Sequence, residues 1–262
     1  MIRKYNVKLS SKFLLVAIVC FCSTNMITAQ YQNIKNDVFW DTKDGKPIYS
    51  QGGGIFKFKD KEGIEKYYWY GVHYEEAEKY RKEPIVTYPN CTFKSITCYS
   101  STDLVNWTFE GDVFFDNKAF PDGRKTWVGR LGVAFVKEMN KYALFVQHGN
   151  QVLVALASSP TSEFIWHQKI NMESWIGTTN TGDQTVFTDD DGKSYLIYSY
   201  GKGRNKIYVS QIGVKDGKVT ILDCTKVFRE QAAKEIVCLS TKISIIWRLR
   251  IFMDGTLLLP II

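Results

Sequence analysis

Three stretches of the chain repeat one order of apolar and polar positions. Each stretch starts with an apolar strand, passes through a charged turn into an aromatic strand, and continues into a third strand that ends in a polar turn. In chain order these segments lie at residues 53–58, 67–70 and 96–107, at 131–136, 142–146 and 152–160, and at 184–187, 195–198 and 206–211. Such repetition predicts an all-β fold built from about three blades of a β-propeller.

Two further features of the pattern support this prediction: the first favours blades over a β-sandwich, and the second favours an all-β chain. A β-sandwich also uses short strands, but it does not repeat a tyrosine-rich strand at the same place in each unit. Helical periodicity is confined to residues 75–82, where a short helix is expected.

The first 29 residues have the pattern of an export signal. Four basic residues precede an apolar run at 13–22, and Ile27, Thr28 and Ala29 offer a small-residue cleavage site. The apolar run is far shorter than the roughly 20 residues that a spanning helix needs, so no stable membrane span is expected. The mature chain is therefore predicted to begin near Gln30 and to be secreted or periplasmic.

Charge and cysteine content exclude several other classes of protein. The formal charge of +7 comes partly from the signal and from the C-terminal tail, and no basic stripe indicates nucleic-acid binding. Four cysteines follow the signal, and their spacing matches no zinc site, so neither a metal nor a cofactor is expected. A disulfide between Cys91 and Cys98 and two buried free thiols remain equal alternatives.

An aspartate-rich segment raises the question of chemistry. Residues 189–191 are aspartates that precede Gly192 between two predicted strands, which is typical of a hairpin turn. A calcium loop would need further oxygen ligands at a longer regular spacing, and these are missing. Asp183 lies before the strand, and a strand-start or turn role is one interpretation of it.

Five motifs together resemble glycoside hydrolase family 43, and most closely its branch related to the exo-β-1,3-galactanases. They are Gln-Gly-Gly-Gly-Ile at 51–55, Tyr-Trp-Tyr-Gly at 68–71, Ser-Ser-Thr-Asp-Leu-Val-Asn-Trp at 100–107, Ala-Ser-Ser-Pro at 157–160, and the segment 182–195. The resemblance covers residues 38–228. It implies a β-propeller of the five-bladed glycosidase type, of which residues 30–233 would supply about three blades.

The resemblance also implies a reaction. Members of this family hydrolyse glycosidic bonds with inversion, using a general acid, a general base and a third acid that tunes the general acid. Asp183 matches the third, tuning position. The implied function is an exported hydrolase that removes terminal galactosyl or arabinosyl residues from plant-type polysaccharides, with an oligo- or polysaccharide as its partner. The alternatives are a non-catalytic glycan-binding propeller and a structural interaction propeller.

This chain departs from the family pattern in ways that leave the substrate open. Many members carry an Asp-Pro general base on the first inner strand, whereas residues 51–54 contain no acid. The second blade normally carries Glu-Arg-Pro, whereas Gly129, Arg130 and Leu131 stand here. The galactanase branch shares the first departure, and a late amide is thought to serve as its base.

Pocket candidates follow from the geometry of the repeated units. Aromatic faces stack on sugar C–H surfaces, and arginine and histidine bind hydroxyl groups, so residues of these types at the ends of inner strands are candidates for substrate binding. They are Gln51, Trp69, Tyr70, His73, Trp127, Arg130 and His148. For each, packing between blades or capping of a strand is the alternative.

Residues 234–262 do not continue the blade pattern. The general acid is expected on a fourth blade, in a segment that resembles Arg-Glu-Gly-Asn, but this chain has Arg-Glu-Gln-Ala-Ala-Lys at 229–234. Our hypothesis for the change is a frameshift near Ala232, and Glu230 is then the remaining in-frame acid that could donate a proton. The alternatives are a natural C-terminal strand and a membrane tail. The nucleotide sequence from codon 225 onward tests the frameshift, which an uninterrupted frame with no blade-like downstream text contradicts.

Overall fold

The computed structural model describes residues 33–89, 91–115, 128–148, 151–180, 182–200 and 206–228, and the backbone of 235–241, 244–250, 252–253 and 256–257. Residues Asp37–Ile262 form one compact unit, and the description below concerns that unit. Within it, β-strands dominate, and the helices are short: α2 (Ala77–Lys82), the single turn α4 (Glu173–Ile176) and the 3-10 turn η1 (Lys137–Met139). The short helix predicted at 75–82 is therefore confirmed, beginning two residues later.

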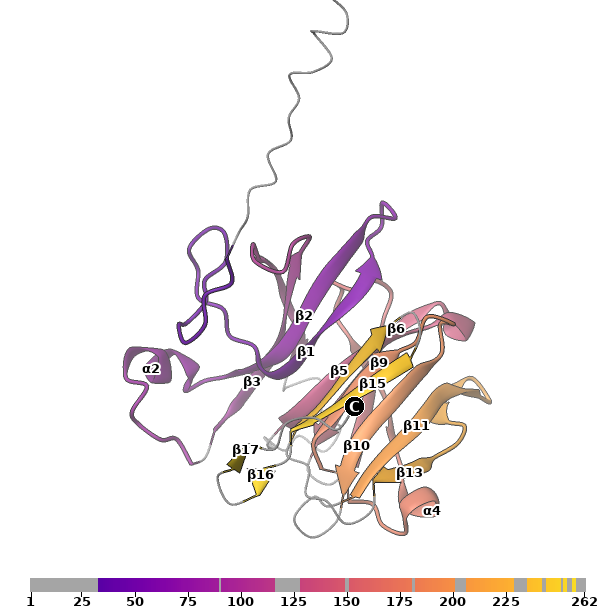
Figure 1. Cartoon of the computed structure of the whole chain (residues 1–262). Helices are drawn as coiled ribbons and strands as arrows, with labels where there is room; N and C mark the ends of the chain where they lie inside the picture. The colour runs from indigo at the N-terminus through magenta and orange to yellow at the C-terminus, as the bar shows by residue number, and fades with distance from the viewer. Residues whose placement is uncertain are drawn as a thin grey trace, which may run out of the picture. The chain divides into compact units, whose positions relative to one another are not determined.

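Three antiparallel sheets make up the blades (Figure 1). The first contains β1 (Gln51–Lys59), β2 (Glu65–Tyr74), β3 (Phe93–Ser101) and β4 (Thr108–Phe115) in that order. The second contains β5 (Val128–Val136), β6 (Lys141–His148), β7 (Gln151–Ala157) and β8 (Ile165–Ile170). Both sheets are meanders of four neighbouring strands, as blades of a propeller are.

The third sheet divides its outer strand in two. It contains β9 (Gln184–Thr188), β10 (Ser194–Tyr200) and β11 (Lys206–Lys215). The second half of β11 pairs with β12 (Lys218–Ile221), and its first half pairs with β13 (Thr225–Phe228). The two short strands together occupy the fourth position, so the prediction of an all-β chain with about three blades is confirmed.

The C-terminal segment forms two hairpins in the part of its backbone that the structure describes. The first joins β14 (Glu235–Thr241) to β15 (Ser244–Arg250), and the second joins β16 (Phe252–Met253) to β17 (Thr256–Leu257). Neither hairpin is extended there into a four-stranded sheet. The frameshift stays a prediction, which the nucleotide sequence decides.

The aspartates at 189–191 build the turn between β9 and β10, as predicted. The backbone N–H of Asp189 donates to the Lys193 carbonyl, and that of Gly192 donates to the Asp189 carbonyl. The carboxylate of Asp191 accepts a hydrogen bond from the Lys193 N–H and forms an ion pair with its ammonium group at 2.6 Å. Local side-chain-to-backbone bonds of this kind explain why these residue types occur here.

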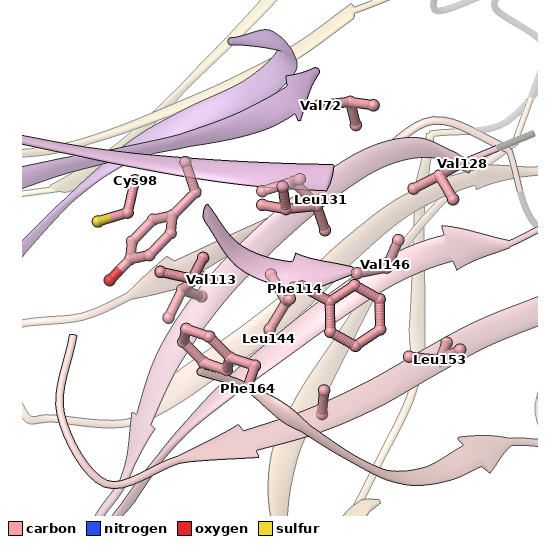
Figure 2. Packing of buried hydrophobic residues seen from close by; sticks show 14 of the residues in the cluster. Val72, Cys98, Val113, Phe114, Val128, Leu131, Leu144, Val146, Leu153 and Phe164 are labelled. Atoms are coloured by element: carbon pink, nitrogen blue, oxygen red, sulfur yellow. The ribbon is translucent and has the colours of Figure 1, made fainter. Parts of the chain in front are cut away.

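Two hydrophobic clusters hold the three blades together. One lies between the first and second sheets, and the other lies between the second and third. Figure 2 shows part of the first cluster, with side chains from both sheets: Val72, Cys98, Val113 and Phe114 from the first sheet, and Val128, Leu131, Leu144, Val146, Leu153 and Phe164 from the second and its loop. Because each sheet buries a face against its neighbour, the blades depend on one another for stability.

The turn between β3 and β4 is organised by one carboxylate. Asp103 accepts hydrogen bonds from the backbone N–H groups of Val105 and Asn106, from the Asn106 side-chain amide and from the Ser101 hydroxyl. Burial alone would raise the pKa of Asp103, but the hydrogen bonds from Asn106, Val105 and Ser101 outweigh it and hold that pKa well below its usual value.

We expect Asp103→Ala to lower the free energy of unfolding by about 1–2 kcal/mol at pH 7, because several donors lose their partner. Asp103→Asn is the matched control, and it should lose less because an amide oxygen still accepts. Since the folded-state pKa is depressed, the stabilisation exists above the unfolded pKa of about 3.9 and disappears as the pH falls through the folded value. Thermal unfolding at pH 7 and pH 3 checks this, and an equal difference between wild type and Asp103→Ala at both pH values contradicts it.

Candidate functional site

The first strands of the three blades carry predicted site residues at or near their starts. Gln51 is the first residue of β1, Arg130 is the third residue of β5, and Asp183 directly precedes β9. Figure 1 shows β1, β5 and β9 next to one another. Residues from three different blades therefore approach one region of the structure.

The structure brings Gln51 and Arg130 to the same end of the inner strands, which we call the inner-strand edge. A Cβ atom placed on Gly52 would lie 3.5 Å from Cδ of Arg130, so the arginine side chain passes directly over the start of β1. At the other end of these strands, the hydroxyl of Tyr142, which pairs with Phe135 of β5, donates to the carbonyl of Lys59. The strands β1 and β5 thus run in the same direction, with their starts side by side.

The third blade packs closely on the second. A Cβ atom on Gly132 of β5 would lie only 2.5 Å from the backbone nitrogen of Val186 in β9, so the two strands approach as closely as a glycine allows. A four-stranded meander reverses direction three times, so its last strand finishes at the same end of the sheet at which its first strand started. The chain can therefore start β9 at the edge that carries Gln51 and Arg130, with Asp183 at that start.

Asp183 is held firmly at its position. Its side chain and backbone together are 9% exposed, and its carbonyl accepts the N–H of Ser199 at 2.9 Å. This bond fixes the residue beside β10 just before β9 begins. The backbone at Asp183 is thus held at the start of the inner strand, in a buried environment, as a role in tuning a neighbouring acid requires.

Gln184 is a buried polar residue that the sequence analysis did not select. It is 4% exposed and pairs with Tyr198 across the sheet. Among the described residues, both of its amide atoms lack a hydrogen-bond partner. A polar residue at an inward position of a predicted strand, next to a candidate acid, is the signal that could have identified it, since buried unpaired amides are costly.

His73 lies on the opposite face of the first blade from the core. Its ring stacks on that of Tyr49, with ring centroids 4.6 Å apart and planes at 10°. Burial lowers the pKa of His73, and the nearby charge of Lys94 lowers it further. The imidazole is therefore neutral at pH 7, so its ring can both donate and accept a hydrogen bond.

Tyr70 is a core residue, which corrects the prediction that it lines the pocket. It is 0% exposed and belongs to the cluster between the first two blades. Its hydroxyl donates to the carbonyl of Pro160 at 2.6 Å. With no exposed surface and its hydroxyl engaged, Tyr70 has no means of contacting a sugar in this conformation.

Three other candidates have different outcomes. His148 is buried at the end of β6, where it pairs with Val128 and Gln151, so it lies close to the start of β5. Trp127 and Glu230 lie outside the described residues. Their proposed roles stay predictions.

Trp69 contributes to a cavity of about 850 Å³ beside the first blade. Its indole meets that of Trp40 edge-on, with centroids 5.8 Å apart, and it also contacts Tyr99 and Trp107. Gln51 lines the same cavity. The remaining lining residues come from 38–40 and 48–50, from Val72 and Tyr74 of β2, from Glu76 and α2, and from positions 84, 86–88 and 91.

Metal and disulfide chemistry find no support in the part of the chain that the structure describes. There, no group of three or more histidine, cysteine or acidic residues is placed to hold a metal ion. Cys91, Cys98 and Cys224 are free thiols, so the free-thiol alternative holds for Cys91 and Cys98. Within the same described residues, no helix has the length and apolar character to cross a bilayer.

Comparison with known families gives one match over most of the chain. Residues 61–238 match the family described as glycosyl hydrolases family 43. None of the curated proteins matches the chain.

Several solved structures are similar in fold. An exo-β-1,3-galactanase from Clostridium thermocellum has a TM-score of 0.67 and 21% identity, with 84% of this chain and 46% of that chain covered. An exo-β-1,3-galactanase from Phanerochaete chrysosporium, solved with galactose, has a TM-score of 0.65 and 18% identity, with coverage of 85% and 48%. A β-1,3-galactosidase solved with galactodeoxynojirimycin has a TM-score of 0.65 and 19% identity, with coverage of 84% and 74%. This chain thus spans about half the length of the two galactanases.

Proposed function

Because the chain belongs to glycosyl hydrolases family 43, we propose that it is a glycoside hydrolase that removes terminal galactosyl or arabinosyl residues from plant-type polysaccharides by an inverting mechanism. The observation that carries the proposal is Asp183, a buried carboxylate fixed at the start of an inner strand. Its sequence motif resembles the one that carries the third acid in the family. The galactanases and the galactosidase with a similar fold support the galactosyl alternative.

The residues near the starts of the inner strands would have different roles in such a reaction. Asp183 holds negative charge near the proton donor, which keeps the donor protonated near neutral pH. Arg130 passes over Gly52, which follows Gln51 in the chain, and the side chains of Arg130 and Gln51 can bind sugar hydroxyls, which would position the ring for attack. A neutral His73 can add a further hydrogen bond.

We propose that turnover by this chain is slow. An inverting mechanism needs both an acid and a base on opposite sides of the sugar. At the described starts of the inner strands, Asp183 is the acidic residue, while Gln51 and Arg130 occupy the corresponding places in the other two blades. Glu230 remains the candidate proton donor outside the described residues.

The polar and apolar pattern of the first 29 residues supports export to the periplasm or the medium. N-terminal sequencing of the protein recovered outside the cytoplasm should begin near Gln30. A mature protein that begins at Met1 contradicts this part of the proposal.

Hydrolysis assays test the reaction. We expect slow release of free sugar from terminal β-galactosides or α-arabinosides, with inverted anomeric configuration. Proton NMR detects the first-formed anomer when enough protein is used for hydrolysis to outrun mutarotation. Release of the retained anomer contradicts inversion.

The second candidate is a non-catalytic glycan-binding propeller, which the amide at Gln51 in place of an acid favours. Binding of a galactoside or arabinoside without any release of sugar supports this candidate. If the protein neither binds these glycosides nor releases sugar from them, both functions are contradicted and a structural interaction propeller remains.

A further inference from the structure

The inner strands of the first two blades both begin with an irregularity. In the first blade, positions 52 and 53 of β1 face one residue of β2, because the ladder shifts register between Gln51 and Gly54. In the second blade, positions 129 and 130 of β5 face one residue of β6, because the ladder shifts between Val128 and Leu131. Two residues opposite one make a β-bulge, which re-aims side chains and is common next to active sites. Both bulges lie at the inner-strand edge.

Arg130 extends from the bulge of β5 over the bulge of β1. Gly52 has a φ of 65°, in the left-handed region that favours glycine. A Cβ atom at Gly52 would meet the arginine side chain, at 3.5 Å from Cδ and 3.9 Å from Nη1. The outer part of this side chain therefore lies over the backbone of β1, where β1 and β5 are neighbours (Figure 1).

The charge of Arg130 is half-buried and unpaired. Within the residues that the structure describes, Arg130 forms no hydrogen bond and no ion pair, with Asp183 or with any other residue. The other arginine whose side chain is described behaves differently: Arg81 donates to the Asp41 carboxylate at 2.6 Å and to the Trp40 carbonyl at 3.1 Å. A guanidinium has five N–H donors and is seldom buried without a partner. The charge of Arg130 is therefore available to a ligand.

The segments around Arg130 suit an anionic ligand. Gly129 stands beside Arg130 where the family motif Glu-Arg-Pro has a glutamate, and neither positions 51–54 nor positions 128–132 contain an acidic residue. A carboxylate that approaches Arg130 thus meets no acidic neighbour from these two strand starts. A like charge there would repel it.

The chemistry of the guanidinium selects the ligand. Hydroxyls of a neutral sugar can accept its hydrogen bonds, but they leave a half-buried charge uncompensated. A carboxylate compensates that charge and accepts two parallel N–H donors from the planar fork. In a polysaccharide, carboxylates are carried by uronic acids.

We propose that the polysaccharide substrate is acidic, and that Arg130 binds the carboxylate of a uronic acid residue next to the terminal sugar. This inference rests on the proposed function for the terminal sugar. It adds the class of sugar that adjoins it in the substrate.

A pair of polysaccharides that differ only in charge tests the inference on the full chain. One is an acidic plant arabinogalactan that contains glucuronic acid, and the other is the same polymer after reduction of its carboxyl groups to primary alcohols. Both carry terminal galactosyl and arabinosyl residues, so the proposed function does not distinguish them. The acidic polymer should bind at least about tenfold more tightly at low salt, and this preference should shrink as the salt concentration rises. Calorimetry measures both affinities, and equal affinity, or no binding of either polymer, overturns the inference.

Substitutions separate recognition by Arg130 from general attraction between a basic protein and an acidic polymer. Arg130→Gln should abolish the preference for the acidic polymer. Arg130→Lys keeps the charge but loses the planar fork, so it should retain only part of the preference. Lys79→Gln is the matched control, because Lys79 is exposed on α2 and the substitution removes an equal charge; this variant should keep the full preference.

Thermal unfolding shows which variants are folded. A preference that survives in folded Arg130→Gln, or that Lys79→Gln reduces equally, overturns the inference. If Arg130→Gln does not fold, Arg130→Lys decides, and an unchanged preference in that variant overturns the inference.

Modification by phenylglyoxal, which attacks guanidinium groups, gives an independent readout. Arg130 should react faster than Arg81, whose guanidinium is engaged by Asp41 and Trp40. The acidic polymer should slow the reaction of Arg130, whereas the reduced polymer at the same occupancy should slow it less. Peptide mass spectrometry distinguishes the two arginines, and equal protection of Arg130 by both polymers overturns the inference.

The two proposals fail in different ways. If the acidic polymer is preferred through Arg130 but no sugar is released from either polymer, uronic acid binding is supported and the proposed hydrolysis is wrong. If both polymers bind equally and release sugar, the proposed function is supported and the role of Arg130 in binding a uronic acid is wrong.

Discussion

Replacing Gly53 with alanine should destabilise the protein by at least about 3 kcal/mol, because the new methyl group has no space. A Cβ atom at this position would lie 1.6 Å from the carbonyl oxygen of Tyr70 and 2.7 Å from Cα of Gly71. Both obstacles are backbone atoms of β2, at the irregular pairing between Gln51 and Gly54. Relief requires β1 to separate from β2, which would disturb the site edge and the core together.

The neighbouring glycine is a matched control. A Cβ atom at Gly54 would lie 2.8 Å from Cζ of Phe56, and the other close atoms belong to the same ring. Since that obstacle is the far end of a side chain, we expect Gly54→Ala to cost less than about 1 kcal/mol. Urea unfolding followed by tryptophan fluorescence measures both variants. Equal losses at the two positions would show that the close approach of β1 and β2 does not limit stability.

The inner three strands of each blade could be predicted from sequence because their faces are buried. Strands β2, β6 and β10 are rich in aromatic and branched residues, and the blade cores select such residues. The outer strands were not predicted. Ile165 and Trp166 of β8 are exposed, and β4 includes the sequence Thr-Phe-Glu-Gly-Asp, so neither strand shows an apolar alternation. Only part of each outer strand is buried, such as Val113 and Phe114 of β4, so the apolar residues do not alternate along its whole length.

The error at Tyr70 has a simple geometric cause. Successive side chains on a strand point to opposite faces, so Trp69 and Tyr70 lie on different sides of β2. In the structure Tyr70 faces the second blade, and Trp69 faces the cavity. The sequence alone did not show which of the two faces would be buried between blades.

The cavity beside the first blade could not be predicted from the pattern of apolar and polar residues. Its lining combines residues from 38–40 and 48–50, from Glu76 and α2, and from positions 84, 86–88 and 91 with the first blade. Two of these segments have no regular secondary structure, and their packing depends on contacts such as the Arg81–Asp41 ion pair at 2.6 Å. Contacts between distant irregular segments leave no periodic signal.

Asp183→Asn should reduce the rate of glycoside hydrolysis at least about 100-fold, the scale of a lost acid–base contribution. The amide has the same shape and leaves the backbone bond from Ser199 to the carbonyl of residue 183 intact. It removes the negative charge that would hold the proton donor protonated. Asp190→Asn is the matched control, since Asp190 is exposed in the turn after β9, and it should retain full activity. Sugar release measured over hours, with thermal unfolding in parallel, compares the variants. A hydrolysis rate that is unchanged in Asp183→Asn would remove Asp183 from the mechanism. An equal loss of rate in Asp190→Asn would do the same, because the two aspartates lie seven positions apart and share only their charge, so the loss would not be specific to the position of Asp183.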